Sequence, residues 1–172
     1  MVYFKKIDVS NITLEPKDSK FINIRYNGNP LMFETPDMYI PFGIEQEYSN
    51  YIIKCQCNKI KDDVDDFFTF IQDVESKLQN LLESENLKSQ IKLSQKYDPL
   101  ILTKLPMNKN KINVEVLSED GENLNIYTLI REHEVNKKFI ECIFIIDSIF
   151  IKGDNYYYKI KIKRIILKQN CV

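Results

Sequence analysis

The chain has 172 residues, of which 44% are hydrophobic and 28% are charged, and its formal net charge is -1. This length and composition predict one globular domain around a single hydrophobic core and exclude disorder over most of the chain. With only four glycines, the chain cannot build a glycine-rich phosphate-binding loop, which disfavours a nucleotide-hydrolysing enzyme.

No apolar run reaches the roughly 20 residues of a membrane-spanning helix, and the first residues, MVYFKKIDVS, lack the layout of a secretory signal. We therefore expect the protein to act inside a cell or a virus particle and not to be secreted. The four cysteines, Cys55, Cys57, Cys142 and Cys171, are too few for a disulfide scaffold, so reduced thiols are expected. With one histidine in the chain, neither a metal nor a cofactor is expected.

The first part of the chain predicts strands. Residues 1–19 form an N-terminal extension with an initial strand, and residues 20–26, KFINIRY, alternate as a strand does. The turn residues NGNP at 27–30 follow. The next strand is predicted within residues 47–60, EYSNYIIKCQCNKI, where Tyr51, Ile53, Cys55 and Cys57 share one face.

Two prolines, Pro36 and Pro41, interrupt the segment between these strands. Proline excludes a helix and also a fully paired central strand. Residues 31–44 are therefore expected to cross the surface as an edge strand or a loop.

One amphipathic helix is predicted over residues 62–85, because apolar side chains recur there at steps of three and four residues. The apolar stripe consists of Val64, Phe67, Phe68, Ile71, Val74, Leu78, Leu81 and Leu82. The other side of the helix is acidic, since the segment carries eight carboxylates and one lysine. The polar residues after Ser84 are expected to fray or to continue the helix to about Leu93.

The second half of the chain returns to strands separated by short turns. The predicted strands are residues 97–105, 111–118, 123–130, 139–151 and 156–167, with turns at Asp120–Gly121 and 153–155. Strands, one helix and further strands in this order predict a mainly β, OB-fold-like barrel with one long helix between its third and fourth strands. We take residues 1–172 as a single domain that the helix at 62–85 caps.

The last predicted strand places Tyr157, Lys159, Lys161 and Lys163 on one face, opposite Tyr158, Ile160 and Ile162. Lysines beside aromatic rings suit single-stranded nucleic acid, because lysines contact phosphates and bases stack on rings. The same residues also suit a purely structural role, since exposed lysines protect an edge strand from aggregation and many aromatic residues fill the core. The candidate binding residues are Lys20, Arg25, Tyr39, Phe42, Tyr51, Lys54, Tyr157, Lys159, Lys161 and Lys163.

The sequence offers few candidates for a catalytic residue. The only histidine, His133, lies in the polar stretch REHEVNKK, where a surface position is more common than a general base. The carboxylates at 62–66 suggest a metal nuclease, but acidic residues on one helix turn more often form a solvated face. We rank a metal nuclease behind the binding functions.

The stretch ETPDMYIPFGIEQEYSNYIIKCQCN resembles a signature of the OB-fold single-stranded DNA-binding proteins of nucleocytoplasmic large DNA viruses, which are related to helix-capped phage proteins. The family's Thr-Pro, Met and Pro-Phe-Gly places are held by Thr35, Pro36, Met38, Pro41, Phe42 and Gly43. YDPLILTKL and DSIFIKGDNYYYKIKIKRIIL resemble the family's later strands, so the resemblance covers residues 20–168.

This resemblance implies a non-enzymatic protein that binds single-stranded DNA during viral replication or repair, in the infected cell or the virion. Two positions depart from the family: Asp37 stands where an aromatic residue is common, and the chain ends in KQNCV instead of the acidic tail of the phage relatives. Contacts with replication proteins would then need another surface, for which the acidic helix face is the candidate. The alternative function is a structural or adaptor protein that binds proteins, and no dimer is required or excluded.

Overall fold

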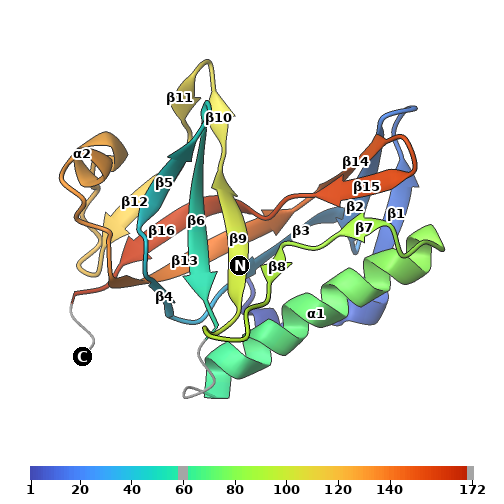
Figure 1. Cartoon of the computed structure of the whole chain (residues 1–172), viewed down its shortest axis with the longest axis horizontal. Helices are drawn as coiled ribbons and strands as arrows, with labels where there is room; N and C mark the ends of the chain where they lie inside the picture. Colours follow the sequence, from blue (N-terminus) through green and yellow to red (C-terminus); the bar gives the residue numbers. More distant parts are fainter. Residues whose placement is uncertain (58–61, 170–172) are drawn as a thin grey trace.

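The computed structural model describes residues 1–57 and 62–169 (Figure 1). Fourteen of its strands belong to one curved sheet, two form a separate hairpin, and α1 (Asp62–Leu82) lies along one side of the sheet. The strands are β1 (Ile12–Pro16), β2 (Phe21–Tyr26), β3 (Asn29–Glu34), β4 (Met38–Ile40), β5 (Ile44–Glu47), β6 (Asn50–Gln56), β7 (Leu87–Lys88), β8 (Ile91–Lys92), β9 (Leu100–Leu105), β10 (Met107–Asn108), β11 (Lys111–Ile112), β12 (Glu115–Ser118), β13 (Lys138–Ile146), β14 (Ser148–Lys152), β15 (Asn155–Tyr158) and β16 (Lys161–Leu167).

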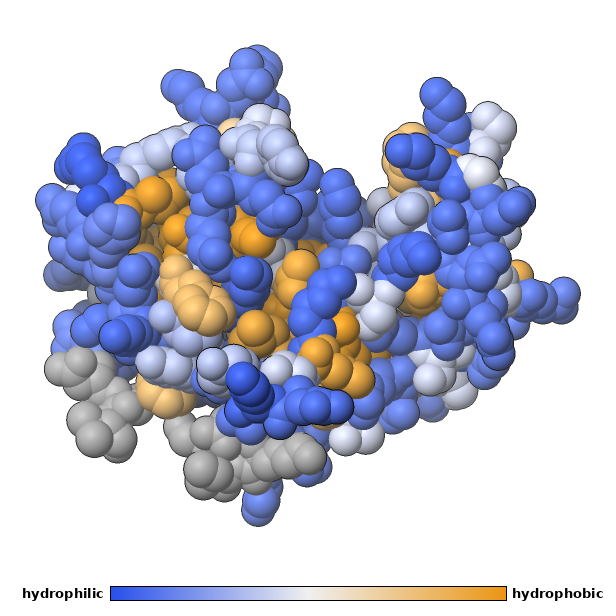
Figure 2. Space-filling view, in the orientation of Figure 1, coloured by the Kyte–Doolittle hydropathy of each residue, from blue (hydrophilic) through white to orange (hydrophobic). Residues whose placement is uncertain are grey.

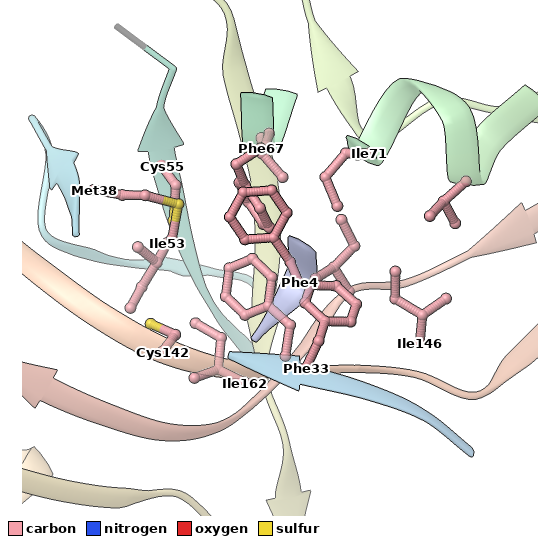
Figure 3. Packing of buried hydrophobic residues seen from close by; sticks show 14 of the residues in the cluster. Phe4, Phe33, Met38, Ile53, Cys55, Phe67, Ile71, Cys142, Ile146 and Ile162 are labelled. Atoms are coloured by element: carbon pink, nitrogen blue, oxygen red, sulfur yellow. The ribbon is translucent and has the colours of Figure 1, made fainter. Parts of the chain in front are cut away.

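The strand pairings close into a circuit. β13 pairs with β16, and the ladder continues through β9, β6 and β4 back to β13. The core packs inside this circuit and under α1, with Met38, Ile53 and Ile162 from its strands fully buried (Figure 3). A second group of strands, β1, β2, β14, β15 and β7, extends the sheet beyond the circuit.

The expected initial strand at residues 1–19 is only partly present. The first eleven residues contain two short 3-10 helices, Phe4–Lys6 and Val9–Asn11, and one isolated bridge from Tyr3 to Glu34, and the first strand is β1. The reason is the burial of Phe4, whose ring lies 5.0 Å from that of Phe67 and 5.6 Å from that of Phe70 on α1. The chain start is therefore folded against the helix.

The turn predicted at NGNP is confirmed. β2 and β3 form a hairpin in which Tyr26 pairs with Asn29, so Asn27 and Gly28 are its two loop residues. Both have positive φ, +50° and +80°, as a type I′ turn requires.

The expectation of an edge strand or a surface loop at residues 31–44 was wrong for β3 and β4. β3 pairs with β2 and β13, and β4 lies between β13 and β6, with Met38 and Ile40 fully buried. Pro36 precedes β4 and Pro41 follows it, so neither proline removes an N–H group from the β4 ladder. Two prolines thus bound a central strand without interrupting it.

α1 ends at Leu82, three residues before the predicted end. Glu83 has a φ of +53°, and the N–H groups of Glu83 and Ser84 bond to the carbonyls of Asn80 and Gln79, which is a Schellman motif. The residues that follow form β7 and β8 in place of a fraying helix. The helix was expected between the third and fourth strands, but six strands, β1 to β6, precede α1 in the described residues.

Residues 123–130, predicted as a strand, contain α2 (Ile126–Arg131). The Asn125 side chain caps this helix by accepting hydrogen bonds from the amides of Tyr127 and Thr128, at 3.0 and 3.1 Å. Ile126 and Leu129, three residues apart, are buried. Local capping therefore decides against the strand.

Cys55, Cys57 and Cys142 are free and buried, and burial raises the pKa of the Cys57 thiol to about 12. Cys171 lies outside the described residues. No helix of the described residues has the length and hydrophobicity needed to cross a membrane.

Candidate nucleic-acid interface

A groove of about 750 Å³ lies between the β10–β11 hairpin and the β14–β15 hairpin. Figure 2 shows the surface hollowed between these two hairpins, with mostly hydrophilic residues on both rims. We call this feature the groove, and its walls consist of Phe21, Asn50, Lys104, Pro106, Met107, Ser148, Phe150, Lys152, Tyr157, Lys159 and Lys161. These residues come from strands that are far apart in the sequence.

Three aromatic side chains form a row in the groove. Phe150 on β14 pairs with Phe21 on β2 and with Tyr157 on β15, so the three residues lie side by side on neighbouring strands. The rings of Phe21 and Phe150 are 5.4 Å apart and tilted by 47°. Phe21 is 37% and Phe150 38% exposed, although both are large apolar side chains. The row therefore presents ring surface to the solvent.

Four lysines lie beside this aromatic row. Lys152 follows Phe150 by two residues, and Lys159 and Lys161 follow Tyr157 by two and four, so strand alternation directs them to the same face. Lys104 comes from β9, where it pairs with Lys161 across the parallel ladder. Lys152 and Lys159 are exposed, and Lys104 and Lys161 are half-buried.

The positive charge of the groove is largely uncompensated. Asp147 forms an ion pair of 3.1 Å with Lys161. No carboxylate lines the groove itself, and within residues 1–57 and 62–169 no ion pair involves Lys104, Lys152 or Lys159. Burial, together with the neighbouring ammonium groups of Lys159 and Lys161, lowers the pKa of Lys104 to about 8.

Two smaller hollows continue the groove. One, of about 300 Å³, shares Phe21, Ser148 and Lys161 with it and adds Lys17 and Arg25. The other, of about 220 Å³, shares three residues with the groove, Asn50, Lys104 and Lys159. Glu47, Tyr48, Ile52, Gln90, Leu102, Thr103 and Ile160 complete its lining. Each smaller hollow therefore adjoins the groove through three shared residues.

The structure brings three of the predicted binding residues, Tyr157, Lys159 and Lys161, together in the groove. Arg25 lines the adjoining hollow, where its side chain forms an ion pair of 3.4 Å with Glu15. Lys20 is exposed in the bend directly before β2 and lines none of these hollows.

Lys163 is also outside the groove, although it continues the alternating row in the sequence. On β13, Ile143 pairs with Arg164 and Phe144 with Ile162, so Lys163 is the extra residue of a β-bulge. A bulge shifts the alternation and gives the side chain a different direction. The row of lysines therefore ends at Lys161.

Tyr39, Phe42 and Lys54 lie elsewhere, on and beside β4 and β6. The Tyr39 ring packs 5.4 Å from the ring of Phe139, and the Lys54 ammonium lies 5.5 Å from the centre of the Phe42 ring. Lys54 also pairs with Glu45 at 3.3 Å.

Tyr51 differs from the other predicted aromatic residues. Its side chain packs against the core, on the inner face that it shares with Ile53.

Sequence reasoning missed Lys104, Lys152, Phe21 and Phe150. Alternation within KFINIRY separates Phe21, Asn23 and Arg25 from the core-facing residues, which was the signal for Phe21. Phe150 gave no such signal, because residues 139–151 are almost continuously apolar. Lys104 belongs to a strand that reaches the groove only through tertiary pairing.

The acidic residues of α1 lie away from the groove, unlike Asp147, which pairs with Lys161. Lys5 forms ion pairs with Asp63 at 2.6 Å and Asp66 at 3.3 Å on the exposed side of α1. Asp37, at the position where the resembled family has an aromatic residue, lies 3.6 Å from Lys168. Within the described residues, no cluster of three or more His, Cys, Asp or Glu is arranged to hold a metal ion.

The chain has the fold of phage single-stranded DNA-binding proteins. It superposes on the single-stranded DNA-binding protein from bacteriophage Enc34 with a TM-score of 0.59, at 11% identity over 94% of this chain and 91% of that chain. The same phage protein in complex with single-stranded DNA gives a TM-score of 0.58, at 9% identity over 94% of this chain and 97% of that chain.

A second phage protein has a similar fold. Bacteriophage T7 gp2.5, also a single-stranded DNA-binding protein, gives a TM-score of 0.52 at 9% identity over 83% of this chain and 88% of that chain. No known family profile matches the sequence, and no curated protein sequence matches it. These similar structures come from phages and not from the large DNA viruses that the sequence resembles.

Proposed function

We propose that this protein binds single-stranded DNA in the groove and has no enzymatic activity. The observation that carries the proposal is the aromatic row of Phe21, Phe150 and Tyr157 beside four lysines from separate strands. Single-stranded DNA-binding proteins combine these two elements, because bases stack on rings while lysines contact the phosphates. The similar folds of two phage single-stranded DNA-binding proteins support the same function.

In this mechanism the bases stack on Phe21, Phe150 and Tyr157. Neighbouring strands are about 4.8 Å apart, so the row spans roughly 10 Å. The phosphates contact Lys104, Lys152, Lys159 and Lys161, and Arg25 and Lys17 extend the positive track. Sequence preference is slight, because every base presents a ring face and the lysines contact only the backbone.

We infer that the closed circuit of β4, β6, β9, β13 and β16 is an OB-like barrel that α1 covers. Following the sequence resemblance, we infer a large DNA virus as the source and a role in replication or repair within the infected cell or virion. The acidic side of α1, with Asp62, Asp65 and Asp73 exposed, is the proposed contact surface for replication proteins.

The test measures the affinity for an oligo(dT) strand by fluorescence anisotropy at several salt concentrations. Four phosphate contacts predict a slope of about -3 in log affinity against log salt, and changing Lys152 and Lys159 together to Gln makes the slope shallower by about 1.4. Lys163→Gln, which removes one positive charge outside the groove, is the control and should leave the slope unchanged. No binding, or binding that does not respond to salt, would favour the structural or adaptor function.

A further inference from the structure

Three ammonium groups converge where β9 meets the junction between β15 and β16. The amide of Lys104 donates a 2.8 Å hydrogen bond to the carbonyl of Ile160, and Lys104 pairs with Lys161 in the ladder. Ile160 is buried, so Lys159 and Lys161 on either side of it point into the groove with Lys104. The backbone thus holds the three lysine side chains on one side of the sheet.

The charged groups around this cluster come from several elements. The ammonium groups of Lys159 and Lys161 both lie close enough to Lys104 to lower its pKa. Asp147 pairs with Lys161, Lys152 and Tyr157 lie in the same groove, and Glu47 lines the hollow that also contains Lys104 and Lys159. Among the described residues, the three lysines are therefore accompanied by only two nearby carboxylates, Asp147, which pairs with Lys161, and Glu47 at the rim. The positive charge of the cluster exceeds the negative charge around it.

We propose that Lys104, Lys159 and Lys161 form a phosphate-binding subsite that takes up a proton when a phosphate group binds. This inference rests on the proposed function and deepens it. A bound phosphate is the anion that relieves the repulsion among the three ammonium groups. The phosphate is either an internal phosphodiester of the strand or a terminal phosphomonoester, and both offer the same anionic oxygens to the lysines.

Proton uptake follows from the state of Lys104 without ligand. Near pH 8 the side chain is partly neutral, because burial and its lysine neighbours lower its pKa to about 8. An anion at the cluster raises that pKa, so the bound form carries more protons than the free form. The affinity for the phosphate group is therefore highest below pH 8. It falls as the pH rises from 8 toward the higher pKa that Lys104 has in the complex.

The experiment measures the affinity for an oligo(dA) strand at constant ionic strength from about pH 6.5 to 9, a range in which adenine does not titrate. If the phosphate raises the pKa of Lys104 by one unit, wild-type affinity falls roughly fivefold over this range. Lys104→Gln weakens binding at every pH and flattens the profile. Lys104→Arg also flattens the profile but keeps the affinity, because its guanidinium stays charged.

Two comparisons separate the possible outcomes. The first compares oligonucleotides that carry a 5′-hydroxyl with oligonucleotides that carry a 5′-phosphate. If the affinity depends on pH only with the 5′-phosphate, the subsite binds a terminal phosphate. If both oligonucleotides give the same pH profile, the subsite binds an internal phosphate. A pH profile that is identical in the wild type, Lys104→Arg and the control Lys163→Gln overturns the subsite, while salt-dependent binding would keep the proposed function.

If no oligonucleotide binds at all, the proposed function fails, and the subsite is tested separately with inorganic pyrophosphate. The NMR signal of the Lys104 Cε group is followed against pH with and without this probe. A titration midpoint that rises in the presence of pyrophosphate supports the subsite, and an unchanged midpoint overturns it.

Discussion

Tyr158 donates a 2.9 Å hydrogen bond to the Glu75 carboxylate and thereby joins β15 to the buried side of α1. Glu75 also accepts hydrogen bonds from the Ser89 hydroxyl at 2.7 Å and from the Gln90 amide at 3.1 Å. Tyr158 lies directly between Tyr157 and Lys159, which line the groove. This network fixes the position of one groove wall relative to the helix.

Replacing Glu75 with Ala is predicted to lower the free energy of unfolding by about 3 kcal/mol, because three donors lose their acceptor and the Tyr158 hydroxyl stays buried. Chemical denaturation measures this change. Asp73→Ala, on the exposed side of the same helix, is the control and should cost less than about 0.5 kcal/mol. Equal effects of the two changes would show that the network adds no stability.

The buried Tyr158 hydroxyl is also expected to make the stability of the protein depend on pH in the alkaline range. Burial, followed by the charge of Glu75 and their hydrogen bond, raises the pKa of Tyr158 well above 10.0. In the unfolded chain the tyrosine hydroxyl has its ordinary pKa of about 10. Because the pKa is higher in the folded protein, the neutral Tyr158 hydroxyl stabilises the fold fully below pH 10, and this contribution is lost as the pH rises above 10. The melting temperature of the wild type should therefore fall more steeply above pH 10 than that of Tyr158→Phe, and parallel curves would contradict the prediction.

The aromatic row predicts a loss of affinity without a comparable loss of stability. Phe150→Ala removes the central ring and is expected to weaken oligonucleotide binding by about 1–3 kcal/mol. The matched control is Phe42→Ala, since Phe42 is 51% exposed and lies outside the groove beside Lys54. Anisotropy titrations compare the two variants, and a greater loss for the Phe42 variant would move the interface to the surface of β4 and β6.

Replacing Tyr48 with Gly is predicted to raise the stability of the protein and to lower its affinity for DNA. It has a φ of +57° in the turn between β5 and β6, is 93% exposed and borders the hollow that contains Lys104 and Lys159. Tyr48→Gly should raise the free energy of unfolding by up to about 1 kcal/mol, because glycine adopts this conformation without a steric cost. The same change removes an aromatic ring from the rim, so affinity should fall. Unfolding curves and titrations on one preparation check both effects.

Periodic patterns in the sequence correctly indicated several local elements. The NGNP stretch specified the β2–β3 turn, because Asn and Gly tolerate positive φ. The apolar stripe of residues 62–82 predicted α1, and the alternation around Ile160 and Ile162 correctly identified their buried face. These features depend on residues a few positions apart, which is why the sequence alone is sufficient.

Other local predictions failed because a neighbouring residue or element changed the secondary structure, the position of a strand in the sheet or the direction of a side chain. The cap at Asn125 made a helix of a segment with strand-like composition. The position of Pro36 and Pro41 outside β4 allowed that strand to be central. The bulge at Lys163 ended the lysine row, and its origin is the register between β13 and β16, which no alternation within one segment contains.

By itself, the sequence determined which residues alternate and where the long helix lies. It also determined that Tyr157, Lys159 and Lys161 share one face after Tyr156. Only the tertiary structure decided that Lys104 from β9 joins Lys159 and Lys161, and that Phe21 and Phe150 complete a row with Tyr157. The physical reason is that the groove forms across strand pairings between distant segments. Register and sheet order, set by the packing of the whole core, place those side chains together.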